Sequence, residues 1–256
     1  MLFCLKGYMS KLTAGIIVIG DEILSGRTQD TNSNFMSKQL IQAGIKLDEI
    51  RVIQDNRDSI IQNILHFHKT YTYVFTTGGI GPTHDDITSE SISAAFNEKY
   101  CFHPKAFKIL EEHYPKGEFN EGRQKMAKMP ENAKLIINPL TAAPGFVIKN
   151  VYVLPGVPEI MQKMFVSLLR IIEKGSPKKT ITLNTNLYES TIAIGLATIQ
   201  NKYLDCSIGS YPYFNYIDKT TGVNIVVSSW NLNNLDYIEE EIKKMILLLG
   251  GKSSIV

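Results

Sequence analysis

Residues 73–90 read YVFTTGGIGPTHDDITSE, an apolar run that enters a glycine-rich turn and leaves through two adjacent carboxylates. Glycine tolerates backbone angles closed to other residues and lets a ligand approach the main chain, and a helix start offers unpaired N–H groups. The segment therefore predicts a strand, a phosphate-binding turn at 78–81 and a helix that begins near Thr88. It is not a P-loop, because no Gly-Lys-Ser/Thr follows, and Pro82 and the glycine spacing exclude the dinucleotide fingerprint.

Strand and helix patterns alternate on both sides of this segment, from residue 13 to about residue 173. Such alternation is typical of α/β proteins in which helices cover both faces of a parallel sheet, and their ligands bind beyond the carboxyl ends of the strands. The predicted strands are 15–19, 45–53, 73–76, 135–137, 145–148 and 151–154. The other predicted helices are about 31–43, 57–69, 103–129 and 157–172.

The pattern changes after Gly175-Ser176-Pro177-Lys178-Lys179, the best candidate for a linker. Beyond it the predicted order is strand (180–185), helix (188–201), strand (206–213), strand (222–229) and helix (233–249). We therefore predict two domains, an α/β domain over 9–175 and a small α+β domain over 176–256. A KH-type RNA-binding fold is an alternative for the second domain, but its Gly-x-x-Gly clamp is absent from this stretch.

Composition and charge narrow the classes of partner. The 256 residues are 44% apolar, which allows a sizeable core, and the net charge of +2 gives no electrostatic case for nucleic acid or an anionic membrane. Three widely spaced cysteines fit a reducing compartment, and no apolar run has the length of a signal peptide or a membrane span, so we expect a cytoplasmic protein. We also predict that Met9 is the true start and that residues 1–8 are a disordered extension.

Acidic side chains collect at the predicted carboxyl ends of the strands. Asp21 and Glu22 follow the first strand, Asp55 follows the second, and Asp85 and Asp86 follow the glycine turn. Such oxygen ligands suit a hard divalent cation that bridges phosphates, so we expect Mg, Mn or Co as the cofactor. The predicted metal ligands are Asp85, Asp86 and Glu159.

Two of these carboxylates have an alternative interpretation as helix caps. Asp55 precedes a predicted helix, and Asp86 precedes the helix after the glycine turn. We favour function for Asp86 because it shares a short loop with three glycines and a second carboxylate, whereas both interpretations of Asp55 stay open. His84 is a candidate general acid or phosphate contact. No serine or cysteine has a context typical of covalent catalysis, which favours metal-assisted hydrolysis or adenylyl transfer.

Several motifs in order resemble the competence/damage-inducible protein A (CinA) family and, more broadly, the molybdopterin-binding domain of the MoaB/Mog type. The motifs are 20–27, 30–32, 77–88, 123–130, 138–139, 143–146, 154–158 and 210–212, and the resemblance covers 13–249. It implies a three-layer α/β/α domain followed by a small α+β domain. It also implies a homo-oligomer, with a dimer favoured over a trimer.

In the CinA branch the resemblance implies a metal-dependent pyrophosphatase that splits ADP-ribose or a related dinucleotide into AMP and a sugar phosphate. In the molybdenum-cofactor branch it implies adenylylation of molybdopterin, and the essential aspartates of that branch fall on Asp55 and Asp86. Asp85 stands where the Mog-like pattern has a basic residue, which favours hydrolysis, and Thr141-Ala142 replaces the usual Gly-Thr. A third alternative is binding of a nucleotide or pterin without turnover. CinA proteins often carry a nicotinamide-nucleotide amidase domain, whose activity we expect to be absent here.

The predicted site combines these residues at one edge of the sheet. The predicted catalytic residues are Asp55, His84, Asp85 and Asp86. The predicted phosphate and ligand contacts are Asp21, Glu22, Ser25, Gly26, Asn34, Gly78, Gly79, Gly81, Thr83, Gly145, Pro155 and Gly156. We expect a small-molecule nucleotide as the ligand, and neither nucleic acid nor a membrane as a partner.

Overall fold

A computed structural model describes residues 12–216, 220–230 and 234–256, so the predicted start at Met9 lies outside the described residues. The chain divides into two compact units between Gly175 and Ser176. Within the three described ranges, no helix has both the length and the apolar character needed to cross a membrane.

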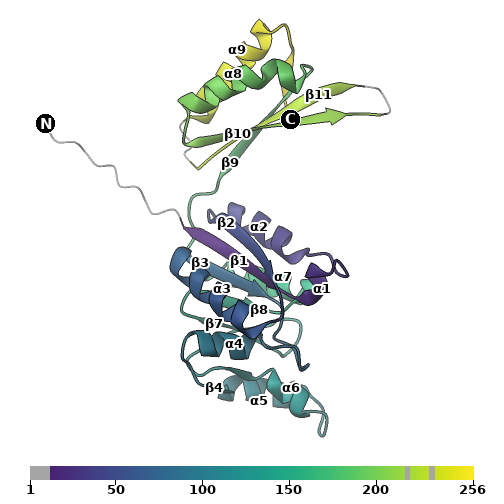
Figure 1. Ribbon diagram of the computed structural model, residues 1–256, viewed down its shortest axis with the longest axis vertical. Helices are drawn as coiled ribbons and strands as arrows, with labels where there is room; N and C mark the ends of the chain where they lie inside the picture. Colours follow the sequence, from purple (N-terminus) through teal and green to yellow (C-terminus); the bar gives the residue numbers. More distant parts are fainter. Residues whose placement is uncertain (1–11, 217–219, 231–233) are drawn as a thin grey trace, which may run out of the picture. The chain divides into compact units, whose positions relative to one another are not determined.

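The first unit is built on a six-stranded sheet with the order β2-β1-β3-β8-β7-β6 (Figure 1). Its strands are β1 (Thr13–Ile19), β2 (Lys46–Ile53), β3 (Tyr73–Thr77), β6 (Lys134–Ile136), β7 (Gly145–Ile148) and β8 (Val151–Leu154). Strands β2, β1, β3 and β8 are parallel, whereas β7 is antiparallel to β8 and β6 is antiparallel to β7. The mostly parallel sheet confirms the predicted fold class.

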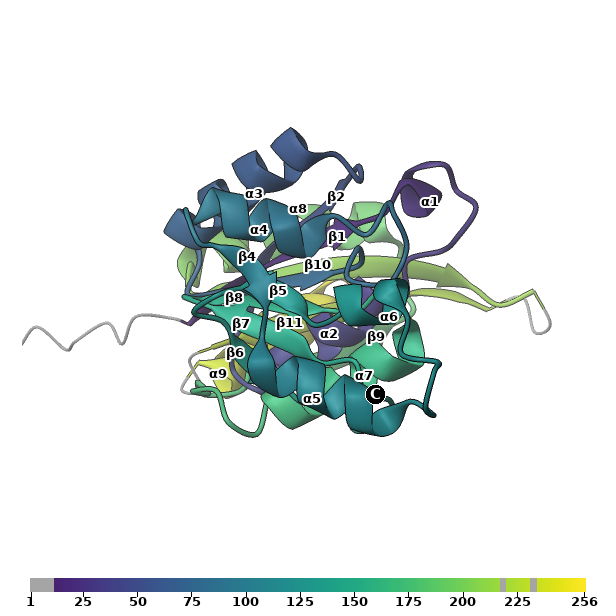
Figure 2. The ribbon, with the colours of Figure 1, turned by 90° about the horizontal axis from the view of Figure 1, so that it is seen from below.

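Helices cover both faces of this sheet. Successive residues of β1 therefore pack alternately in two cores, one on each face. Ile16 and Val18 pack in the core that contains α2 (Asn32–Gln42) and α7 (Pro158–Leu168), while Ile17 and Ile19 pack in the core of the other face. The helices of that face are α3 (Arg57–Thr70), α4 (Thr88–Ala95) and α5 (Pro104–His113). Figure 2 shows α3 and α4 side by side. The nearly continuous burial of β1 and β3 is typical of parallel strands covered on both faces.

Two helices in this unit are shorter than predicted. The segment 103–129 is not one helical region, because after α5 the chain turns at Gly117, whose φ is +88°, and forms only the short helix α6 (Glu121–Lys125). Lys128–Pro130 is then a strand, β5, that pairs antiparallel with the unpredicted strand β4 (Tyr100–Phe102). Helix α7 ends at Leu168 instead of 172, and Ile171 beyond it is 81% exposed.

The second unit has the order β9 (Lys179–Thr185), α8 (Glu189–Lys202), β10 (Cys206–Phe214), β11 (Thr221–Ser229), α9 (Leu235–Leu248) and β12 (Ser253–Ile255). Its sheet has the order β10-β11-β9-β12, and all neighbouring strands are antiparallel. Ile192 and Leu196 of α8 and Ile242 of α9 pack against Ile225 of β11 and Leu183 of β9. This is the β-α-β-β-α-β arrangement of ferredoxin-like folds. The α+β class was predicted, whereas the short strand β12 was not.

Candidate functional site

The carboxyl ends of the parallel strands lie at one edge of the first unit's sheet. Ile19 pairs with Ile53 and Thr77 pairs with Leu154, so the loops after these strands begin close together. The chain after β1 leads through the unpredicted four-residue helix α1 (Asp21–Leu24) to α2 on one face, whereas the chain after β3 leads to α4 on the other face. Open α/β sheets usually bind ligands in the crevice at such a switch point.

The glycine turn after β3 packs too closely to accommodate side chains. Gly78 has a φ of +107° and Gly79 a φ of +68°, values that favour glycine. A Cβ atom on Gly78 would lie 2.1 Å from the carbonyl oxygen of Ile19, and one on Gly79 would lie 2.1 Å from Thr88 Oγ1. The N–H of Thr88 donates a hydrogen bond of 3.0 Å to the Gly79 carbonyl, which joins the turn to the start of α4. The turn therefore presents main chain at the crevice.

A cleft of about 530 Å³ surrounds this turn, a volume within the usual range for small-molecule sites. The loops 78–82 and 155–157 form part of its lining. The side chains that complete it are Glu22, Asp86, Tyr114, Met126, Asn138, Thr141, Ala143, Pro144 and Ile160. The structure therefore brings the predicted residues Glu22, Gly78, Gly79, Gly81, Asp86, Pro155 and Gly156 together around one cleft.

Asp55 and Asp21 hold each other at the edge of this site. Asp55 Oδ2 accepts a hydrogen bond of 3.0 Å from the N–H of Asp21, and Asp21 Oδ1 accepts one of 3.4 Å from the N–H of Asp55. Burial raises the pKa of Asp55; the hydrogen bond from Asp21 opposes this shift, and the charges of Asp21, Glu22 and Asp85 add to it. The capping alternative for Asp55 was wrong, because the Asn56 side chain caps α3.

Asp86 braces the loop between the glycine turn and α4. Its Oδ2 accepts hydrogen bonds from the N–H of Thr83 at 2.8 Å and from Thr83 Oγ1 at 2.5 Å. A Cβ atom on Gly81 would lie 2.7 Å from the same oxygen, so the carboxylate rests directly against the turn. Within the described residues, helix α4 has no side-chain cap, which shows that the capping alternative for Asp86 was wrong as well.

The rest of this loop is exposed and is tethered from α6. His84 and Asp85 are exposed and do not line the cleft. Hydrogen bonding from Thr83 lowers the pKa of Asp85, and its main-chain hydrogen bonding and the nearby charges of His84 and Lys125 act in the same direction. Lys125 Nζ donates a hydrogen bond to the Thr83 carbonyl. The loop is therefore positioned by α6 as well as by its own carboxylate.

Several further predicted site residues lie away from the cleft lining. Ser25 and Gly26 are exposed after α1, Asn34 is exposed on α2, and Glu159 is exposed in the first turn of α7. Gly145 is buried in β7, where a Cβ atom would lie 2.4 Å from the Val153 carbonyl oxygen, so this glycine serves strand packing.

The carboxylates fit a cation shared with phosphates better than a cage of protein ligands. Among the described residues, no group of three or more His, Cys, Asp or Glu side chains is placed to hold a metal ion. Asp55 and Asp86 instead lie against the two ends of the glycine turn, because a Cβ atom on Gly79 would be 3.5 Å from Asp55 Oδ1 and one on Gly81 would be 2.7 Å from Asp86 Oδ2. Mg²⁺ is commonly bound by one or two carboxylates together with substrate phosphates, and these two residues suit that mode.

Asn32 is a site residue that the predicted contacts do not include. Its Nδ2 donates hydrogen bonds to Thr77 Oγ1 at 2.9 Å and to the Gly156 carbonyl at 2.7 Å, which joins the start of α2 to the ends of β3 and β8. Asn32 Oδ1 and Thr88 Oγ1 are buried and have no hydrogen-bond partner within the described part of the chain. The signal was present in the 30–32 motif, where Asp30 accepts a hydrogen bond from the N–H of Asn32.

Two segments of the chain match known protein families. Residues 15–174 match the family described as probable molybdopterin binding domain. Residues 178–248 match the family described as FAD synthase, middle domain. The chain belongs to the molybdopterin-binding domain family.

Its relatives include competence-damage inducible proteins. A putative competence-damage inducible protein of Clostridium botulinum is 30% identical over 92% of this chain, and the match spans 60% of that relative's length. A protein of Archaeoglobus fulgidus is 36% identical over 79% of this chain and 86% of its own length. The solved structure of the protein CinA from Thermoplasma acidophilum, whose function is described as unknown, is 31% identical with a TM-score of 0.59 and matches 62% of this chain and 96% of that one. The resemblance to CinA is thereby confirmed.

Proposed function

We propose that the chain is a metal-dependent nucleotide pyrophosphatase that hydrolyses ADP-ribose or a related dinucleotide to AMP. The observation that carries this proposal is the position of two carboxylates, Asp55 and Asp86, beside the same main-chain turn. A diphosphate needs donors that it can approach closely, and its bridging cation needs oxygen ligands. The turn and Asp86 line one cleft of nucleotide size, and Asp55 lies beside the turn at Gly79.

The residues of the cleft have separate roles in this proposal. Gly78 and Gly79 would place main chain against the phosphates, because neither residue carries a side chain. Asp86 keeps the loop in shape through Thr83 while it faces the cleft. Burial is the main cause of the raised pKa of Asp55, and the charges of Asp21, Glu22 and Asp85 add to it; a bound cation would oppose both effects. A divalent cation held by Asp55 and Asp86 would stabilise the charge that develops on the leaving phosphate.

A second candidate function is adenylylation of molybdopterin. The match of residues 15–174 to the molybdopterin-binding family favours it. In that reaction the same turn and carboxylates would hold the phosphates of ATP beside the pterin. A third candidate, supported by the same cleft, is binding of a nucleotide or pterin without turnover.

Calorimetry followed by product analysis separates these three candidates. The full chain is titrated with ADP-ribose, NAD and FAD in the presence of Mg, Mn or Co, and each mixture is then assayed for AMP. Our proposal predicts binding and metal-dependent release of AMP from ADP-ribose. Binding without any product would support a carrier or sensor. Transfer of AMP from ATP to molybdopterin, without dinucleotide hydrolysis, would support the adenylyltransferase.

A further inference from the structure

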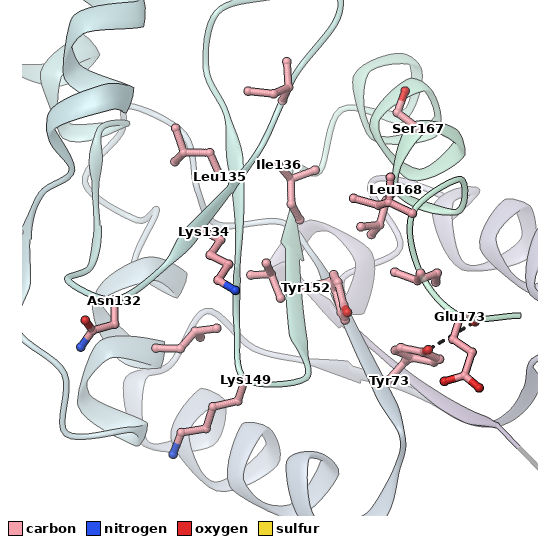
Figure 3. A pocket seen from close by; sticks show the side chains of 15 residues that line it. Tyr73, Asn132, Lys134, Leu135, Ile136, Lys149, Tyr152, Ser167, Leu168 and Glu173 are labelled. Carbon is pink, nitrogen blue, oxygen red and sulfur yellow. Dashed lines mark hydrogen bonds between the residues drawn. The ribbon is translucent and has the colours of Figure 1, made fainter. Parts of the chain in front are cut away.

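A hollow larger than the cleft lies elsewhere in the first unit, beside the edge strand β6. It is a groove of about 750 Å³, called here the β6 groove, and Figure 3 shows side chains that line it. Aromatic and aliphatic side chains dominate it, among them Tyr73, Tyr152, Ile136 and Leu168. Tyr73 begins β3, whereas the cleft lies at the end of that strand, so the two hollows are distinct. The described lining of the β6 groove contains no glycine, so the main-chain donors that suit a phosphate are found at the cleft instead.

Two carbonyl groups of the loop 155–157 are held on the side away from the cleft. The Pro155 carbonyl accepts a hydrogen bond of 2.9 Å from Thr77 Oγ1, and the Gly156 carbonyl accepts one of 2.7 Å from Asn32 Nδ2. Gly156 lines the cleft, whereas neither Asn32 nor Thr77 is among the described residues that line it. The two carbonyl oxygens, which would repel a phosphate, therefore point away from the cleft.

The opposite side of the same two peptide units carries N–H groups. The described residues contain no cis peptide bond, and in a planar trans peptide the N–H and the C=O point in opposite directions. The N–H groups of Gly156 and Val157 therefore point away from Asn32 and Thr77. Within the described ranges, neither N–H donates a hydrogen bond to another residue, and both residues line the cleft. Two unpaired main-chain donors thus remain on the cleft side of the loop.

Asn32 is suited to hold this arrangement, because its surroundings fix its amide group. The residue is only 6% exposed, and its N–H donates a hydrogen bond of 2.9 Å to Asp30 Oδ1 at the start of α2. Thr77 Oγ1 donates its proton to the Pro155 carbonyl, so it accepts the other hydrogen bond of Asn32 Nδ2, at 2.9 Å. Both protons of the amide are therefore committed, one to Thr77 and one to the Gly156 carbonyl.

We propose that Asn32 is a positioning residue of the cleft, and that the donors which it orients, the N–H groups of Gly156 and Val157, bind a phosphate beside the glycine turn. The two loops are neighbours, because a Cβ atom on Gly156 would lie 3.4 Å from Gly78 Cα, so one diphosphate can contact both. Asn32 acts through the Gly156 carbonyl and does not itself touch the phosphate. This inference rests on the proposed function, because it assigns these donors to the diphosphate of that substrate.

Amide NMR of the full chain tests the placement of the donors without any turnover. The probe is inorganic pyrophosphate in the presence of Mg²⁺. Saturating pyrophosphate should move the amide protons of Gly156 and Val157 downfield, because each then donates a charge-assisted hydrogen bond. The amide proton of Gly117, a residue that does not line the cleft, should stay in place.

A variant of Asn32 tests its positioning role. Asn32→Ser should bind pyrophosphate about tenfold more weakly and show smaller shifts at Gly156, because serine is too short to hold the Gly156 carbonyl. Asn34→Ser is the matched control, since it makes the same change at an exposed residue of α2 outside the cleft lining and should bind as the unaltered chain does. Calorimetry measures the affinities, and circular dichroism checks the fold. A purely structural role in α2 would lower stability without altering these shifts in the folded variant.

Three results would overturn the inference. One is a failure of the unaltered chain to bind pyrophosphate. Another is binding that leaves the amide protons of Gly156 and Val157 in place. The third is a folded Asn32→Ser variant that binds pyrophosphate as tightly as the unaltered chain. Pyrophosphate binding with the expected shifts, but without AMP release from ADP-ribose, would instead contradict the proposed function alone.

Discussion

At the scale of single residues, Gly79 faces two separate constraints, its positive φ and its contact with Thr88. We expect Gly79→Ala to destabilise the first unit by about 2–4 kcal/mol, because strain at a positive φ adds to the clash with Thr88 Oγ1. Gly117→Ala is the matched control, since Gly117 has a φ of +88° but a Cβ atom there would have no described atom within 4 Å, so only the backbone strain of about 1–2 kcal/mol remains. Urea unfolding measures both, and equal losses would contradict the close packing of the turn.

The raised pKa of Asp55 predicts how the stability of the fold depends on pH. A carboxyl group whose pKa rises on folding destabilises the fold where it is ionised, and this cost is absent below the usual value of 3.8 and complete above the raised value. We therefore expect Asp55→Asn to be more stable than the unaltered chain at pH 7, and the difference to shrink as the pH falls towards 3.8. Denaturant unfolding at several pH values checks this. A variant that is less stable at pH 7 would show that the carboxylate is stabilised by its surroundings.

The turn and its carboxylates could be located from the sequence because glycines and acids at strand ends are visible in the residue order. On α2 the predicted contact, Asn34, is exposed, whereas Asn32 makes the hydrogen bonds to Thr77 and Gly156. Residues two apart on a helix point about 200° away from each other, so the choice depends on how α2 is rotated against the sheet. The rotation of α2 is set by the packing of Met36 and Leu40 in the core. The sequence of α2 alone does not specify this packing.

At the scale of secondary-structure elements, α6 supports the loop 82–86. Lys125 donates a hydrogen bond to the Thr83 carbonyl, and a Cβ atom on Gly122 would lie 3.3 Å from the Pro82 carbonyl oxygen. We expect Lys125→Met to raise KM for the nucleotide several-fold while the free energy of unfolding changes by less than about 0.5 kcal/mol. Lys105→Met, an exposed change on α5, should alter neither quantity. Steady-state kinetics and urea unfolding measure the pair, and identical KM values would contradict a supporting role for α6.

The long elements could be predicted because their apolar periods are clear. The missed elements are short: β4, β5 and β12 have 3 residues each, and α1 has 4. A strand of that length exists only because a partner lies beside it, as Cys101 pairs with Met129. The end of α7 was missed for a related reason, because the apolar spacing continues through Ile171 although that side chain no longer faces the core.

At the scale of the whole molecule, the chain has separate cores in two units. The division between Gly175 and Ser176 falls within the segment 175–179 that the sequence marks as a linker. All residues of the cleft lie in the first unit, and so do those of the β6 groove. The β6 groove was outside the reach of sequence reasoning, because it depends on where α7 ends and on β6 being the edge of the sheet.

Release of AMP from ADP-ribose with Mg²⁺, compared between the unaltered chain and Asp86→Asn, tests the central claim most directly. We predict metal-dependent AMP formation that falls by at least about a hundredfold in Asp86→Asn, because the variant loses a charge at the phosphate turn. The fold should persist, since an amide oxygen still accepts from Thr83. Asp58→Asn, at an 83% exposed side chain, is the matched control and should retain full activity. Normal AMP release from Asp86→Asn would contradict the account.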